Sequence, residues 1–182
     1  MNARLLFLRL HIPASVRRTI LMELIAATAR AFERPSPESA GLSVPEMLIR
    51  AAGFSRTCAE EAMRAGSDLG RIEQRLFSEA FVLGRRARER LGVAGVAEGL
   101  AAARVVYRAI GIDFRPRSMG DVMVVRCAFA RVYGPDVCRL MSSMDSGLIA
   151  GLTDAGGLHF TGRITEGASA CRALLLAPGH LS

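Results

Sequence analysis

The sequence predicts an α+β fold in which an N-terminal layer of helices packs on a four-stranded antiparallel sheet. Apolar residues recur with the helical period of about 3.6 residues as far as Gly111, and with the strand period of about 2 beyond it. The second part contains two pairs of short apolar segments, and one helical segment separates the pairs. We therefore expect two hairpins that flank one helix, in the order ββαββ, with helices on one face of the sheet.

Length and composition favour a single domain over residues 1–182. A chain of 182 residues is long enough to bury a substantial core without the help of disulfides. With 51% hydrophobic and 23% charged residues, the composition is that of a globular protein rather than a disordered one. Within this domain we expect N-terminal helices over 1–66, an α+β core over 67–176 and a short tail over 177–182.

Start and stop signals place three helices of the N-terminal layer. The first runs over about 13–32, since proline is tolerated in a first helical turn and a pair of prolines follows the segment. A long amphipathic helix is expected over 67–92, and an alanine-rich helix over about 96–110. Each of these two segments ends at a glycine, the residue most favoured just beyond a helix C-terminus.

Two capping boxes close together predict a helix-turn-helix between the first and second of these helices. Ser43 and Glu46 begin a short helix that is expected to end at Gly53. Thr57 and Glu60 form a second capping box and are expected to begin another helix. The spacing resembles that of bacterial repressors, so a DNA-binding regulator is one alternative function.

The charge pattern does not favour nucleic acid as the partner. All 24 basic residues are arginine, and the net charge is +7. These arginines are spread along the whole chain rather than clustered, whereas nucleic-acid-binding proteins concentrate basic residues on one face. Arginine without lysine, together with abundant alanine, is typical of a GC-rich bacterial genome.

The C-terminal half carries the strand signals. Strands are expected over 112–118, 121–129, 158–165 and 170–176. The first pair is joined around Met119 and Gly120, and the second around Gly167. Between the pairs, a helix begins at Pro135 and runs to about Leu152.

Alternation along the strands sorts their side chains between the two faces of the sheet. If the register is kept, Cys127 and Cys171 both point to the apolar side. The side chains expected beside them are Met123 and Val125 on one strand and Ala173 and Leu175 on the other. The opposite face is expected to hold Arg126, His159, Arg163 and Arg172. These residues form either a solvated face or a cradle for a carboxylate ligand, which arginine binds with its planar fork.

A carboxylate falls on the apolar stripe of the helix that begins at Pro135. The stripe contains Cys138, Met141, Asp145 and Leu148 at helical spacing. A carboxylate in apolar surroundings must be paired or have its pKa raised toward neutrality, which is what a general acid or base needs. The alternative is that Asp145 lies at the edge of the stripe, where it is merely exposed, or accepts a hydrogen bond from a backbone amide.

The cysteines indicate a reducing compartment. Four widely spaced cysteines without a signal peptide favour free thiols and a cytoplasmic location. No apolar run reaches the ~20 residues needed to span a membrane, so no membrane partner is expected. The cysteine spacing lacks any CxxC pair, and neither a metal nor another cofactor is expected. The thiols are also open to a plainer interpretation as small buried hydrophobic side chains.

Five positions share the order and intervals of a known family: Cys127, Cys138, Asp145, Gly167 and Cys171. In these positions the chain resembles the L-2-amino-thiazoline-4-carboxylic acid hydrolase-like family, over about residues 67–176. That family is similar to the 4-vinyl reductase-type ligand-sensing domains. The chain departs from the family pattern at Ala128, where proline is usual, and at Arg172-Ala173, where an acidic-aromatic pair is usual.

The resemblance implies hydrolytic opening of a small cyclic amidine (isothiourea) carboxylate. Asp145 would transfer protons, Cys127 would be the candidate nucleophile, and Cys171 its neighbour. Arg163 and Cys138 would contact the substrate. A thiol in apolar surroundings keeps a high pKa unless a positive group is near, which weighs against the nucleophile. The alternative is a non-catalytic domain that binds or senses a small molecule, and a homo-oligomer is left open.

Overall fold

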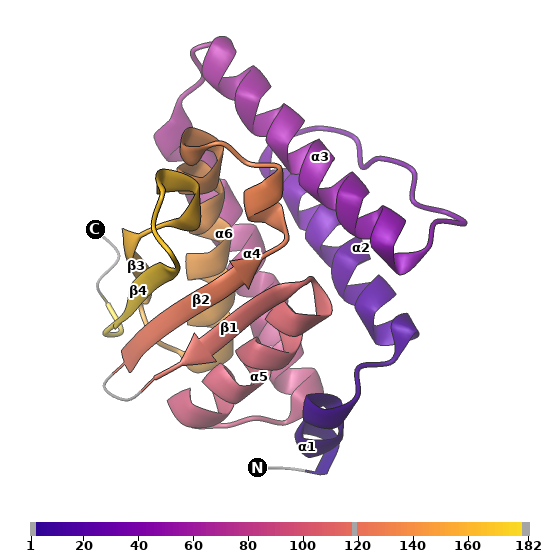
Figure 1. The fold of residues 1–182 in the computed structure, drawn as a ribbon, viewed down its shortest axis with the longest axis vertical. Helices are drawn as coiled ribbons and strands as arrows, with labels where there is room; N and C mark the ends of the chain where they lie inside the picture. Colours follow the sequence, from indigo (N-terminus) through magenta and orange to yellow (C-terminus); the bar gives the residue numbers. More distant parts are fainter. Residues whose placement is uncertain (1–2, 118–119, 180–182) are drawn as a thin grey trace.

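The computed structural model describes residues 3–117 and 120–179 and has the α+β fold expected from the sequence (Figure 1). Five helices come first: α1 (Ala3–Leu10), α2 (Ala14–Ala31), α3 (Val44–Arg64), α4 (Leu69–Leu91) and α5 (Gly95–Ala109). The ββαββ part follows: β1 (Ile112–Pro116), β2 (Asp121–Cys127), α6 (Pro135–Thr153), β3 (Gly157–Gly162) and β4 (Cys171–Leu176). Short 3-10 turns η2 (Phe129–Arg131) and η3 (Ile164–Glu166) follow β2 and β3.

The four strands form one antiparallel sheet in the order β1-β2-β4-β3. Each hairpin is a neighbouring pair, and the two hairpins meet where β2 pairs with β4. The prediction of two hairpins around one helix in a single sheet is therefore confirmed. Of the expected turns, Met119 lies outside the described residues, whereas Gly120 and Gly167 have the positive φ angles of 82° and 91° that favour glycine.

Helix α6 lies between the sheet and α4 (Figure 1). The backbones of α4 and α6 approach so closely that a Cβ on Gly147 would overlap the carbonyl oxygen of Phe77. Gly84 of α4 and Gly151 of α6 face each other in the same contact. Because α6 is covered on both sides, the side chains on its sheet-facing stripe are held in fixed positions.

The predicted long helices are confirmed, and the end of α4 at Gly92 is as expected. Asp68 accepts a hydrogen bond from the backbone N–H of Arg71 at the start of α4, and Gly92 ends that helix in the left-handed conformation. Helix α1 falls within the expected N-terminal helices, but it was not placed individually from the sequence. A tertiary contact caps it: the guanidinium of Arg108 on α5 donates to the last carbonyls of α1, those of Leu8 and Arg9. No helix within residues 3–117 and 120–179 is long and apolar enough to cross a bilayer.

The predicted helix-turn-helix is wrong, because α3 runs unbroken through Gly53. The capping box at Ser43 and Glu46 begins α3 as expected, with both of its hydrogen bonds formed. Thr57 and Glu60 lie inside the helix, where Glu60 instead pairs with Arg56 at 2.7 Å. One internal glycine costs a helix only about 1 kcal/mol. The buried stripe of α3 outweighs this cost, since it continues on both sides of Gly53, from Met47 to Ala59.

A β-bulge in β2 changes which residues share a face with Cys127. Asp113 pairs with Arg126 and Phe114 with Val124, so Val125 is left without a partner. The extra residue reverses the alternation, as bulges do. Cys127 therefore faces the core with Val124, and the prediction that it lies beside Met123 and Val125 is wrong.

A second bulge, in β3, changes the side of the sheet on which Arg163 lies. Phe160 pairs with Ala173 and Gly162 with Arg172, so Thr161 is the unpaired residue. The side chain of Arg163 consequently lies on the inner side of the sheet, and its predicted place on the outer face is wrong. The other members of the predicted arginine face, Arg126, His159 and Arg172, are exposed.

Two glycine-to-alanine substitutions should have opposite effects on stability. At Gly53 no atom lies within 4 Å of an added Cβ. Gly53→Ala should therefore raise the free energy of unfolding by about 0.5–1 kcal/mol, the difference between the two residues inside a helix. At Gly147 the same change forces α4 and α6 apart, and it should lower the free energy of unfolding by about 1–3 kcal/mol or more.

Urea denaturation of both variants and of the wild type measures the two effects, and each variant is the control for the other. A loss of stability in Gly53→Ala would contradict a continuous α3. An unchanged Gly147→Ala would contradict the close contact of α4 with α6.

Candidate functional site

Asp145 of α6 is the centre of the site. It is partly buried, and its Oδ1 atom accepts a hydrogen bond of 2.9 Å from the hydroxyl of Tyr107 on α5. Tyr107 is itself buried and stacks on Phe114 of β1, with ring centroids 4.6 Å apart. Asp145 is thus a partly buried and paired carboxylate rather than an exposed residue at the edge of the stripe.

Burial dominates the electrostatics of this carboxyl group. It raises the pKa of Asp145 from 3.8 to about 6, although the hydrogen bond from Tyr107 and the nearby positive charge of Arg163 lower it. Burial and the negative charge of Asp145 raise the pKa of Tyr107 well above its ordinary value. Tyr107 therefore remains a hydrogen-bond donor at any pH at which the protein works, while Asp145 changes charge near neutrality.

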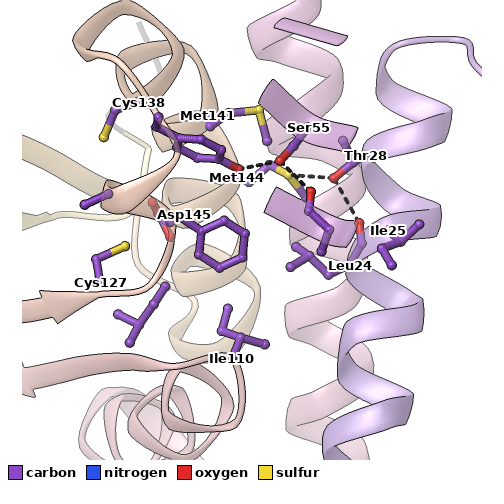
Figure 2. Close-up of a pocket in the computed structure, with 15 residues that line it drawn as sticks. Leu24, Ile25, Thr28, Ser55, Ile110, Cys127, Cys138, Met141, Met144 and Asp145 are labelled. Atoms are coloured by element: carbon purple, nitrogen blue, oxygen red, sulfur yellow. Dashed lines mark hydrogen bonds between the residues drawn. The ribbon is translucent and has the colours of Figure 1, made fainter. Parts of the chain in front are cut away.

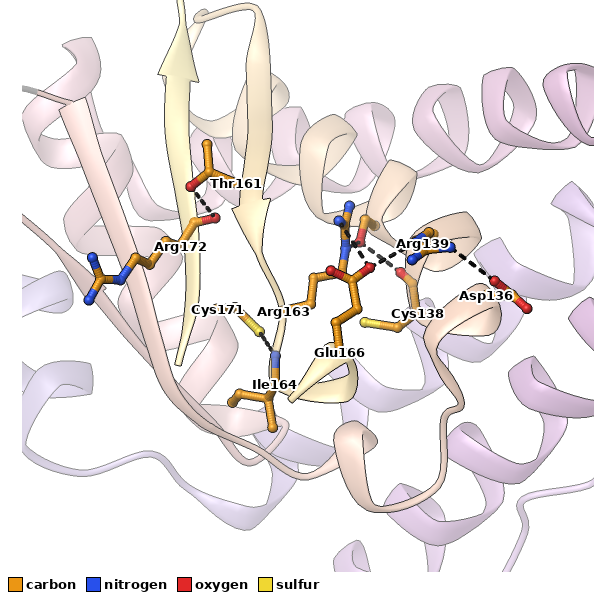
Figure 3. Close-up of polar contacts among 10 residues, drawn as sticks. Asp136, Cys138, Arg139, Thr161, Arg163, Ile164, Glu166, Cys171 and Arg172 are labelled. Atoms are coloured by element: carbon orange, nitrogen blue, oxygen red, sulfur yellow. Dashed lines mark hydrogen bonds and ion pairs between the residues drawn. The ribbon is translucent and has the colours of Figure 1, made fainter. Parts of the chain in front are cut away.

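Arg163 supplies the positive charge of the site (Figure 3). Its side chain is only 17% exposed, and its guanidinium carbon lies 4.9 Å from the centre of the Phe160 ring. Its Nε donates to the Ser142 hydroxyl at 3.3 Å. The nearest carboxylate oxygen paired with it belongs to Glu166, at 3.8 Å. Because Arg139 binds the same oxygen at 2.7 Å, the charge of Arg163 is only weakly compensated within the protein.

The three cysteines predicted for the site are neutral thiols. Burial raises the pKa of Cys127 to about 12, and it also raises the pKa values of Cys138 and Cys171. The Sγ atom of Cys171 accepts a hydrogen bond of 3.4 Å from the backbone N–H of Ile164 (Figure 3). None of these thiols has the low pKa that marks a reactive cysteine.

All five site residues predicted from the sequence line one cavity between α6 and the sheet. We call it the sheet cavity; its volume is about 50 Å³. The five residues are Cys127, Cys138, Asp145, Arg163 and Cys171. They come from β2, α6, β4 and the end of β3, so the fold gathers residues that the sequence separates by up to 44 positions, from Cys127 to Cys171.

A second cavity lies on the other side of Asp145, between α6 and the helices α2 and α3 (Figure 2). We call it the helix cavity; its volume is about 80 Å³. The two cavities share four lining residues, which are Ile112, Cys127, Cys138 and Asp145. The carboxyl group therefore borders both spaces.

Sequence reasoning missed Tyr107, Ser142 and Tyr133. The chain has only two tyrosines, and both lie near Asp145: Tyr107 donates to it, and Tyr133 lines the helix cavity. Tyr107 is an aromatic residue in an alanine-rich helix, and this was the one available signal for it. Ser142 carried no signal, because its role depends on Arg163 being turned inward by the bulge.

Within the described parts of the chain, no three His, Cys, Asp or Glu side chains come together as ligands for a metal ion. Comparison with protein-family models, with curated proteins and with solved structures gives no match for the chain. The chemistry of the site is therefore the basis for assigning a function. It offers a carboxylate that titrates near neutrality, a weakly compensated arginine and neutral thiols, arranged around two small apolar cavities.

Replacing Asp145 should change how stability depends on pH. Since the folded pKa of about 6 exceeds the ordinary 3.8, the folded state holds this proton more tightly, and wild-type stability falls as the pH rises from about 4 to above 6. The full difference between the folded and the ordinary pKa of Asp145 corresponds to about 3 kcal/mol of stability, at 1.36 kcal/mol per pKa unit. Asp145→Asn keeps the acceptor for Tyr107 without the charge, so it should be the more stable protein at pH 8.

Urea denaturation at pH 5, 6, 7 and 8 measures this difference. The advantage of Asp145→Asn should shrink as the pH is lowered through 6. An advantage that does not vary with pH would show that the carboxyl group is not ionised in a buried position.

Proposed function

We propose that the chain binds a small cyclic amidine carboxylate with its carboxylate in the sheet cavity and its ring at the boundary with the helix cavity, and opens the ring by hydrolysis. The observation that carries the proposal is the partly buried Asp145 carboxyl group, with a pKa of about 6, facing the inward Arg163. An acid–base group works best when its pKa lies near the working pH. Arginine binds carboxylates through its planar fork, and the charge of Arg163 has little compensation from Glu166.

In the proposed reaction, water adds to the ring carbon that lies between nitrogen and sulfur. Asp145 in its ionised form takes a proton from the water as the oxygen bonds to carbon. That proton passes to the ring nitrogen, and the second proton of the water passes to sulfur as the carbon–sulfur bond breaks. The products are a urea group, which keeps the oxygen, and a free thiol, so one water is consumed.

The thiols of the site favour direct attack by water over a covalent intermediate. A thiol with a pKa of about 12, as at Cys127, is protonated at neutral pH and is a poor nucleophile. Arg163 lowers the pKa values of Cys138 and Cys171, but burial has the larger effect at both. In this proposal Cys127, Cys138 and Cys171 form the apolar wall of the cavity.

Asp145→Asn should lower the turnover of 2-amino-thiazoline-4-carboxylate by about a hundredfold or more, the scale of a lost general base. Wild-type kcat/KM should rise with pH through about 6, because the ionised carboxylate is the active form. Mass spectrometry of the product, which gains one water, measures both.

The matched control is Asp136→Asn, which removes an exposed carboxylate from the same helix. Turnover in this control should stay within about twofold of the wild type, since surface substitutions away from a site have small effects. Equal turnover in Asp145→Asn and the wild type would reject the role proposed for Asp145.

Two arginines allow a test of the carboxylate anchor. Arg163→Gln should raise the Kd or KM for the thiazoline carboxylate by about ten- to a hundredfold, the cost of losing one charge-assisted pair. Arg172→Gln is the control, because Arg172 is only nine positions away but points outward from the sheet. Isothermal titration calorimetry measures both, and equal losses in the two variants would mean that only net charge matters.

A second candidate is binding without turnover, as in a ligand-sensing domain. The small size of the two cavities and the neutral thiols favour binding without turnover, because a ligand can bind beside unreactive thiols in a small cavity without being chemically changed. The same variants separate the two functions. A sensing domain should bind the thiazoline carboxylate without consuming it, and Asp145→Asn should then alter affinity alone.

The state of the cysteines supports a reducing compartment, and we propose the cytoplasm. All four cysteines, Cys58, Cys127, Cys138 and Cys171, are free. Free thiols persist where glutathione and thioredoxin keep them reduced.

A further inference from the structure

The helix cavity is a second space beside the proposed reaction site, and its chemistry differs from that of the sheet cavity. Helices α2 and α3 supply one wall, with Leu24, Ile25 and Ala51 among its residues (Figure 2). Helix α6 supplies the other, with Met141 and Met144. These side chains are aliphatic or thioether groups, which favour an apolar occupant.

The hydroxyl groups in this wall are already hydrogen-bonded within the protein. Thr28 donates to the carbonyl oxygen of Leu24 at 2.9 Å and contacts the sulfur of Met144 at 3.5 Å (Figure 2). Ser55 donates to the carbonyl oxygen of Ala51 at 2.8 Å, and its hydroxyl meets that of Tyr133. The remaining polar group of the lining is Asp145, at the boundary with the sheet cavity.

The two cavities therefore present three kinds of group in a fixed order. Arg163 offers a positive charge in the sheet cavity, Asp145 offers a negative charge at the boundary, and the helix cavity offers an apolar space. A molecule that fits has a carboxylate, then a positively charged N–H group, then an apolar substituent. This is the arrangement of an α-amino acid or a cyclic amidine derived from one.

We propose that the helix cavity is the specificity subsite for an apolar substituent on the ligand, and that the ligand is a small amino-acid-like carboxylate with a branched alkyl group. The proposal rests on the proposed function, from which it takes the carboxylate bound at Arg163. It adds an N–H group that donates to Asp145, the apolar substituent, and the residues that recognise that substituent. These residues are Ile25, Ala51, Met141 and Met144, which belong to α2, α3 and α6.

Volume limits the size of the substituent. A rigid apolar cavity of about 150 Å³ holds a benzene ring, so the helix cavity, at about 80 Å³, holds about three or four carbon atoms. The methionines can adjust by changing rotamer, as flexible thioether side chains do. An isobutyl group is of this size.

Four commercial probes test the three groups separately, using the full chain and titration calorimetry. Leucine carries all three groups, alanine lacks the larger substituent, isoamylamine lacks the carboxylate, and 4-methylpentanoate lacks the ammonium group. Leucine should bind at least about tenfold more tightly than alanine, since about 0.8 kcal/mol per buried CH₂ over three carbons exceeds a factor of ten. It should also bind at least about tenfold more tightly than isoamylamine and 4-methylpentanoate, because each of these loses one charge-assisted pair. Leucine binding no tighter than alanine would overturn the proposal.

A cavity-filling variant identifies the subsite. Ala51→Leu adds three carbons to the wall of the helix cavity, and it should weaken leucine binding at least about tenfold more than alanine binding. Ala130→Leu fills the same cavity from η2 and should do the same, which guards against a folding defect in either variant. Gly53→Ala, also on α3 but outside the lining, is the control and should bind leucine like the wild type. An equal loss for leucine and alanine in both filling variants would also overturn the proposal.

The outcomes separate this inference from the proposed function. If 2-amino-thiazoline-4-carboxylate binds and depends on Arg163 while leucine and alanine bind equally, the sheet cavity holds the ligand and the apolar subsite is wrong. If the thiazoline fails to bind while leucine binds, and Ala51→Leu weakens leucine binding, the apolar subsite is right and the proposed reaction is wrong.

Discussion

The hydrogen bond from Tyr107 to Asp145 is the interaction on which the site depends. An ionised carboxylate without a partner inside a protein is strongly unfavourable, and a partner must be supplied by the fold. Tyr107 can serve because α5 packs on both α6 and β1, which lets its ring stack on Phe114 while its hydroxyl reaches the carboxylate. This single contact therefore links α5, α6 and the sheet around a carboxyl group whose pKa is raised to about 6.

The close contact of α4 with α6 explains why Asp145 cannot turn away from the cavities. Glycines at Gly84, Gly147 and Gly151 allow the two helix backbones to meet, and any side chain at Gly147 would separate them. The stripe of α6 on the side away from α4, which carries Asp145, therefore packs toward the sheet. A carboxylate on that stripe has no route to solvent by rotation of the helix, so it stays where burial raises its pKa.

Much of the fold and part of the site were predictable, because local signals are strong at helix ends and in the alternation of strands. The capping box at Ser43 and Glu46, the glycine at Gly92 and the change of period at Gly111 all act within a few residues. The unbroken α3 was not predictable, because the continuity of its buried stripe depends on packing against other helices. Helix α1 depends likewise on a distant residue, Arg108.

The two bulges show why the faces of the sheet were only partly predictable. Val125 and Thr161 are the extra residues of the two bulges. No residue type in either strand indicates a bulge from the sequence. Both bulges lie toward the same end of the sheet, where Val124 pairs with Cys171, and both turn a side chain inward: Cys127 and Arg163. A regular sheet would leave Arg163 in water and Asp145 without a positive charge nearby. The irregularities in pairing thus create the electrostatic pattern of the site, in which Asp145 borders both cavities and Arg163 lines the sheet cavity.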